Sequence, residues 1–166
     1  AAAIAEAYDY RQHRDMLASL AQHSRYFLVA PSKFDTPSDT QGEVAFGPRY
    51  YEGAAAGAVL VGQAPNLATF REMFDWPDAV VEISPDGSDV ANILRTLEAD
   101  PQRLREISRR NVIETLLRHD WLYRWQHIYQ IAGLEFSPGM AARQAHLQEL
   151  AASISQSNLA SVAEVD

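Results

Sequence analysis

The chain has 166 residues, of which 47% are hydrophobic and 22% are charged, a composition typical of one globular domain. Its formal net charge of -8 argues against broad binding to nucleic-acid phosphates, and its lack of cysteine excludes disulfides, thiolate nucleophiles and cysteine metal sites. No apolar run approaches the roughly 18 to 20 residues that a membrane span needs. We therefore expect a cytoplasmic protein with no membrane span and no nucleic-acid partner.

The first half of the chain alternates helical and strand patterns. The expected elements are helix 9–23, strand 25–30, a long polar loop at 33–46, helix 48–57, strand 58–62, helix 66–74 and strand 79–83. Asp9 is placed to cap the first helix, and Pro48 suits the first position of the second because its missing N–H has no partner there. Gly57 is expected to end that second helix.

From Ser88 onward the pattern is helical. The expected caps are Ser88 or Asp89 for the first of these helices, Asp100 with Pro101 for the second, and Asp120 for the third, which ends before Gly133. A final helix is expected at 139–155, followed by a fraying tail. We divide the chain into a Rossmann-like domain at 1–133 and a C-terminal helix and tail at 134–166.

This order of elements predicts an α/β fold, with a Rossmann-like parallel sheet, helices on both faces and an all-helical C-terminal region. Three strands are few for such a sheet, which usually has about five or six. We therefore expect an incomplete sheet whose apolar edge is exposed or covered by a partner.

The stretch at 47–62 reads G-P-R-Y-Y-E-G-A-A-A-G-A-V-L-V-G and has one acidic residue on a small, apolar helix behind a glycine-containing loop. In open parallel sheets, ligands bind beyond the carboxyl ends of the strands. Backbone N–H groups of Gly47, Arg49 and Tyr50 are expected to face an anion, with the Arg49 guanidinium as a further donor. Glu52 suits the two hydroxyls of a ribose. The alternative is a surface ion pair between Arg49 and Glu52.

Motifs for other chemistry are absent from the sequence. The five histidines include no pair at i, i+4, so we expect no metal site. The sequence has no G-x-G-x-x-G loop, no G-x-x-x-x-G-K-[ST] loop and no G-x-S-x-G elbow, and we expect no cofactor. The arginine-rich stretch at 103–118 is expected to be a solvated helix face, and H-D-W at 119–121 is attributed to helix capping and core packing.

Several motifs occur in the order found in one enzyme family. They are P-S at 31–32, F-G-P-R-Y-Y-E-G-A-A-A-G-A-V-L-V at 46–61, D-P-Q-R-L-R-E-I-S-R-R-N at 100–111 and H-D-W-L-Y-R-W at 119–125. Over roughly residues 9–133 the chain resembles the C-terminal half of GT-B glycosyltransferases of the group-one type, especially the subgroup related to spore-maturation proteins.

The resemblance implies a domain that binds a nucleotide-sugar donor, with the acceptor held against an N-terminal domain. It implies that Glu52 accepts the ribose hydroxyls and that the turn at 46–49 lies along the diphosphate or the transferred sugar. Arg49 is the expected catalytic cation, because charge develops on the leaving nucleoside diphosphate. The expected donor-binding residues are Glu52, Gly47, Phe46, Pro48, Tyr50 and Ser32.

The chain departs from the family pattern in two respects, at the second Glu and in the absence of the family's upstream Arg/Lys phosphate-binding segment and N-terminal domain. Many relatives have a second Glu eight residues before the ribose Glu, where this chain has Val44; Glu43, one residue away, is kept as a second catalytic candidate. The acceptor domain also lies outside these residues, so we expect an N-terminal domain or a partner chain and no transfer by this chain alone.

The leading hypothesis is the donor-binding portion of a glycosyltransferase, with the nucleotide-sugar as substrate. The alternatives are a non-catalytic nucleotide-sugar-binding module and a GT-B-type sugar-nucleotide epimerase. A further alternative is an interaction domain in which the helix with Trp121, Tyr123 and Trp125 packs against a partner.

Overall fold

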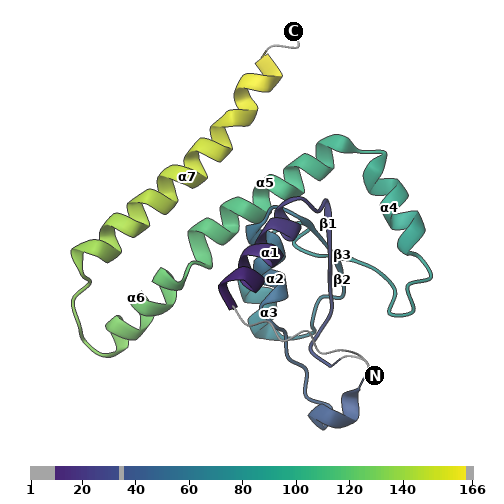
Figure 1. The fold of residues 1–166 in the computed structure, drawn as a ribbon, viewed down its shortest axis with the longest axis horizontal. Helices are drawn as coiled ribbons and strands as arrows, with labels where there is room; N and C mark the ends of the chain where they lie inside the picture. Colours follow the sequence, from purple (N-terminus) through teal and green to yellow (C-terminus); the bar gives the residue numbers. More distant parts are fainter. Residues whose placement is uncertain (1–9, 34–35, 164–166) are drawn as a thin grey trace.

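A computed structural model describes residues 10–33 and 36–163. Its centre is a parallel sheet with strands in the order β1-β2-β3, in which Tyr26 is paired with Val59 and Val61 with Val81 (Figure 1). The strands are β1 (Tyr26–Val29), β2 (Val59–Gly62) and β3 (Val81–Glu82). Neighbouring parallel strands need a crossover connection. A helix lies between β1 and β2 in the chain, and another lies between β2 and β3.

Helices cover both faces of this sheet. Leu60 of β2 is buried with Tyr50 and Phe70 on one face, whereas Val59 and Val61 point to the other face, as the two-residue period of a strand requires. From the start of the described chain to Arg118, the helices around the sheet are α1 (Tyr10–Gln22), α2 (Arg49–Ala55), α3 (Ala68–Met73), α4 (Val90–Glu98) and α5 (Pro101–Arg118). The predicted α/β fold, a Rossmann-like parallel sheet between helices, is confirmed.

Two glycines permit close packing around β2. A Cβ atom on Gly62 would lie 1.7 Å from the carbonyl oxygen of Val29, so no larger residue fits there. Gly57 ends α2 with a φ of 75°, in the left-handed region that glycine adopts without strain. The predicted end of α2 and the predicted buried strand after it are therefore both confirmed.

A buried amide links α5 to the sheet. Asn111 is fully buried, and its Nδ2 donates to the carbonyl oxygen of Ala58 at 2.9 Å. Its Oδ1 accepts from the indole Nε1 of Trp76, also at 2.9 Å. Because both polar atoms of the amide are satisfied, this burial fixes the position of α5 without leaving an unpaired group.

Two helix caps occur as the sequence predicts. The carboxylate of Asp100 accepts from the N–H of Arg103 at the start of α5, and that of Asp120 accepts from the N–H of Leu122 at the start of α6. The last two helices, α6 (Trp121–Ile131) and α7 (Pro138–Ala163), follow α5 and extend to one side of the sheet (Figure 1). The helical C-terminal region is thus confirmed.

Three local predictions need correction. Asp89 precedes α4, but its carboxylate accepts from the N–H and Oγ of Ser84 and makes no cap. Pro48 is the residue before the first helical position, not the first position itself. The chain after Ser155 is not a tail, because α7 continues to Ala163 without a glycine or proline to end it. The predicted cap at residue 9 lies outside the described residues.

The β1 strand is an edge of the described sheet and is only partly buried. Leu28, which was expected in a buried strand, has 71% of its surface exposed. The predicted exposed apolar sheet edge is therefore confirmed. Trp121, Trp125 and Ile128 share one face of α6, as their spacing predicts, and all three are exposed. Among the described helices, none combines the length and the apolar character needed to cross a bilayer.

Candidate functional site

The structure brings Ser32 and Gly47 together beyond the carboxyl end of β1. The N–H of Ser32 donates to the carbonyl oxygen of Ala45 at 2.7 Å, which holds the two ends of the polar loop against each other. A Cβ atom on Gly47 would lie 3.6 Å from the Ser32 Oγ. The loop inside this closure contains the short helix η1 (Pro37–Thr40). Two of the predicted donor-binding residues are therefore neighbours.

The aromatic side chains of this site belong to the core. Tyr50 is fully buried, its hydroxyl donates to the carbonyl oxygen of Gln63 at 2.7 Å, and burial raises its pKa to about 12. Phe46 is half-buried, with its ring edge against Phe70 at a centroid distance of 5.0 Å. Tyr50 therefore has only its backbone N–H available for a ligand, whereas Phe46 shapes the turn.

The start of α2 presents free donors. Among the described residues, the N–H groups of Gly47, Arg49 and Tyr50 have no acceptor. The guanidinium of Arg49 is exposed and also has no partner in the described part of the chain. The first N–H groups of a helix carry partial positive charge, so these donors and Arg49 favour an anion in the same place.

Gly53 explains why Glu52 faces away from the sheet. A Cβ atom on Gly53 would lie 2.5 Å from Leu60 Cδ2, so α2 packs with this glycine directly on β2. Tyr50 and Ala54 are buried on the same side. Glu52 consequently lies on the other side of α2, where it is half-buried.

The Glu52 cavity, as we name the hollow into which Glu52 faces, has a volume of about 330 Å³. Its walls come from α2, α5, α6 and α7 and include Tyr51, His119, Trp121 and Arg143. In the described chain the carboxylate has no partner, and the alternative ion pair with Arg49 is not formed. Sequence reasoning missed the other walls, because no local pattern indicates that α7 returns to α2.

His119 and Asp120 have structural roles, as predicted, whereas Trp121 of the same motif is 73% exposed and is not part of the core. His119 Nε2 lies 2.9 Å from the carbonyl oxygen of Met73, and burial lowers the pKa of the ring to about 4. Burial acts to raise the pKa of Asp120, but hydrogen bonds from Arg143 and the Leu122 N–H outweigh it, so the pKa is lowered. Asp120 thus links the start of α6 to α7.

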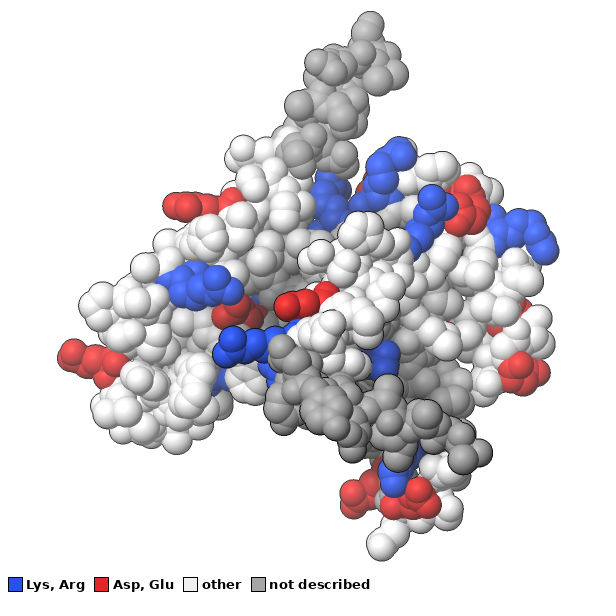
Figure 2. All heavy atoms as spheres, in the orientation of Figure 1, with Lys and Arg blue, Asp and Glu red and all other residues white. Residues whose placement is uncertain are grey.

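The arginines of α5 divide into paired and unpaired side chains. Arg103 makes two hydrogen bonds to Asp78, at 2.9 and 3.0 Å, and Arg118 pairs with Asp75 and Glu114. Arg105, Arg109 and Arg110 have no partner among the described residues. Figure 2 shows basic side chains gathered over α5. The exposed Arg105 and Arg110 agree with the predicted solvated helix face, and Arg103 and Arg118 are held there in ion pairs.

A comparison with known protein families identifies the family of this chain. The family model described as glycosyl transferase-like matches residues 5–130. The chain belongs to this glycosyl transferase-like family. The matched region includes all three strands, the loop at 46–49 and Glu52, whereas α7 lies beyond it. No curated protein and no solved structure matches this glycosyl transferase-like chain.

Proposed function

We propose that this chain is the donor-binding portion of a glycosyltransferase and that Glu52 accepts the ribose hydroxyls of a nucleotide-sugar. The observation that carries this proposal is a half-buried carboxylate without a partner among the described residues, one turn behind a loop with free N–H donors. Partial burial of an unpaired charge is unfavourable, and two ligand hydroxyls offset that cost. Family membership supports sugar transfer as the reaction class.

The diphosphate lies, in this proposal, against the start of α2. The N–H groups of Gly47, Arg49 and Tyr50 and the Ser32 hydroxyl supply hydrogen bonds, while Pro48 and Phe46 set the shape of the turn. The Arg49 guanidinium stabilises the negative charge that grows on the leaving nucleoside diphosphate as the glycosidic bond breaks. Glu43, which is exposed, is the second catalytic candidate in the same loop.

The acceptor is held, in this proposal, by an N-terminal domain or a partner chain. The support is the β1 edge, where Leu28 is exposed on a strand that has no neighbour on one side among the described residues. An edge strand presents unpaired N–H and C=O groups, which a further parallel strand satisfies.

The experiment is a calorimetric titration with UDP, GDP and their sugar conjugates. For Glu52→Ala we expect an affinity for the bound nucleotide about tenfold or more below that of the wild type, because charged hydrogen bonds to the ribose are lost. Glu149→Ala removes an exposed carboxylate on α7 and serves as the control, with unchanged affinity. The donor-site proposal fails if no nucleotide binds, or if the wild type and Glu52→Ala bind the nucleotide with the same affinity.

A non-catalytic nucleotide-sugar-binding module is the second candidate, favoured by Val44. This residue occupies the position of the second family Glu and is 47% exposed, so an apolar side chain faces solvent where a carboxylate is expected. Release of nucleoside diphosphate from a bound donor distinguishes the two, when it is measured with an acceptor extract in the protein that includes the acceptor domain. An enzyme releases it and a binding module does not.

A further inference from the structure

A second cavity lies at the amino-terminal ends of the strands, whereas the turn at 46–49 lies beyond their carboxyl ends. This cavity has a volume of about 630 Å³ and is lined by residues just before β1, such as Ser24 and Arg25, and by Val59 at the start of β2. This basic cleft, as we name it, is therefore separate from the proposed donor site.

None of the described residues that line the basic cleft is acidic. Arg25, Arg105, Arg109 and His23 line it, together with two serines, although the whole chain has a formal net charge of -8. In an acidic protein, arginines gathered without carboxylates around a cavity concentrate positive potential there. Arg25 contributes little of it, because its guanidinium pairs with Glu98.

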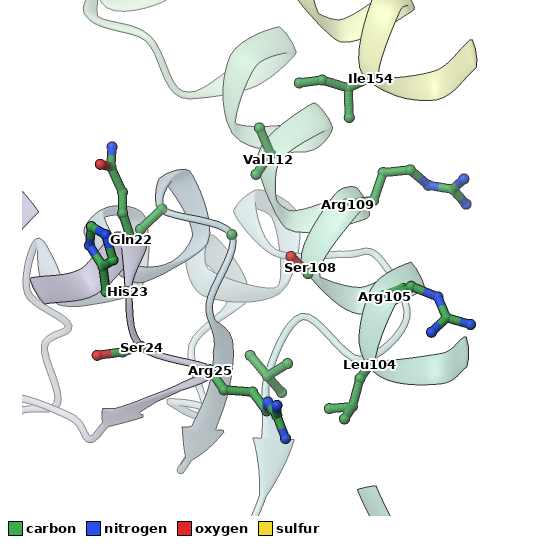
Figure 3. Close-up of a pocket in the computed structure, with 13 residues that line it drawn as sticks. Gln22, His23, Ser24, Arg25, Leu104, Arg105, Ser108, Arg109, Val112 and Ile154 are labelled. Carbon is green, nitrogen blue, oxygen red and sulfur yellow. The ribbon is translucent and has the colours of Figure 1, made fainter. Parts of the chain in front are cut away.

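Arg105 and Arg109 are the available cations. They are one turn apart, and Figure 3 shows both leaving α5 toward the same side, which is the side away from Gln22 and Ser24. Neither has a partner among the described residues, and the hydroxyl of Ser108 between them is likewise without a hydrogen bond there. Guanidinium groups at this spacing bind the oxygens of a phosphate from two directions.

Two helix ends oppose this charge but do not cancel it. The carboxyl ends of α1 and α2 reach the cleft at Gln22 and Ala56, and each contributes about half a negative charge. Some of their carbonyl groups are already occupied, since Ser24 Oγ donates to Leu20 O and the Gly57 N–H donates to Ala54 O. Two full guanidinium charges therefore leave the cleft positive.

The rest of the lining is apolar. Val59, Leu104, Val112 and Ile154 line the cleft together with the arginines. We propose that the basic cleft binds an organic phosphate, with its phosphate group between Arg105 and Arg109 and its organic body against these aliphatic side chains. The site is independent of the proposed function, because it shares no residue with the turn at 46–49 or with Glu52.

The test uses phenyl phosphate as the probe, titrated into the protein and followed by NMR and calorimetry. We expect saturable binding to one site, shifts of the backbone amide signals of Gly57 and Ser108, and weaker binding of inorganic phosphate, which lacks the organic body. Arg105→Gln combined with Arg109→Gln is expected to lower the affinity about tenfold or more, since two charge-assisted contacts are lost. Added salt should weaken binding as well.

Two single variants make this test decisive. Arg110→Gln removes the neighbouring exposed arginine, which does not line the cleft, and should change the affinity less than about twofold. Arg49→Gln removes the cation at the proposed donor turn and should leave phenyl phosphate binding unchanged. Absence of saturable binding, or an equal loss in Arg110→Gln and the double variant, would overturn the proposal. So would a loss in Arg49→Gln, because the phosphate of the probe would then occupy the donor site.

Discussion

Burial decides the charge state of His119. Its ring stacks on Phe74 at a centroid distance of 5.2 Å, and burial lowers the ring's pKa from 6.5 to about 4. The unfolded chain therefore binds a proton at a higher pH than the folded chain does. As the pH falls from 6.5 toward 4, protonation of the unfolded state lowers the free energy of unfolding, and above pH 6.5 this effect is absent.

We predict that His119→Phe reduces the acid sensitivity of the fold. The variant keeps an aromatic ring but cannot bind the proton. The decrease in the free energy of unfolding between pH 7 and pH 5 should be about 1 kcal/mol smaller than in the wild type, after allowance for the ring's partial exposure. Urea denaturation of both proteins at the two pH values measures it. An equal decrease in both proteins contradicts the assignment.

Among the secondary-structure elements, the close packing of α2 on the sheet determines where the candidate site lies. A Cβ atom at Gly53 would lie 2.5 Å from Leu60 Cδ2 and 2.9 Å from Phe27 Cδ1. Leu60 is fully buried, so its side chain has little room to move away. The small residue at this position therefore lets α2 lie close to the strands, with Glu52 directed into its cavity.

Gly53→Ala is expected to destabilise the protein by about 1–2 kcal/mol, because overpacking exceeds the gain in helix propensity. Gly139→Ala is the matched control on α7, where the nearest atom to the added methyl group lies at an ordinary 3.8 Å. The control should be neutral or slightly stabilising. Thermal unfolding of the two variants measures the difference, and equal stability would show that α2 is not packed this tightly.

Local signals in the sequence predicted much of this fold. Asp100, Asp120 and Gly57 act within a few residues of their own position, so their roles as helix caps and stop could be predicted. The role of Asp89 could not be predicted in this way, because its carboxylate accepts from Ser84, which only the folded turn brings near. The core role of Tyr50 likewise depends on residues distant in the sequence.

Part of the candidate site could also be predicted from the sequence. The turn at 46–49 and Glu52 follow from the order of strand, loop and helix. The Glu52 cavity does not, because Arg143 and Trp121 reach it only through the packing of α6 and α7. The basic cleft could not be predicted for a similar reason. In the sequence Arg105 and Arg109 belong to a solvated helix, and only the fold brings the end of α1 and the starts of β1 and β2 beside them.

At the scale of the whole molecule, α7 packs on the helices that flank the sheet. Leu147 of α7 is only 2% exposed and lines the Glu52 cavity with residues of α5, whereas Leu150, three residues later, is 38% exposed. We infer that the segment 134–163 and the sheet unfold together, although the sequence suggested a division at residue 133.

We predict that Leu147→Ala destabilises the whole molecule by about 2–3 kcal/mol, whereas Leu150→Ala costs less than about 1 kcal/mol. Both variants should unfold in one transition, monitored by tryptophan fluorescence and by circular dichroism. Two separate transitions, or an effect of Leu147→Ala on helix content alone, would mean that α7 is an independent unit.

In the proposed donor site, the Glu52 carboxylate contacts the ribose diol of a nucleotide-sugar. The most direct test of this contact compares whichever of UDP and GDP binds more tightly with the 2′,3′-dideoxy analogue of that nucleotide, in the wild type and in Glu52→Ala. We predict that removal of the two hydroxyls weakens binding about tenfold or more in the wild type and has almost no effect in the variant. The same loss in both proteins would contradict it.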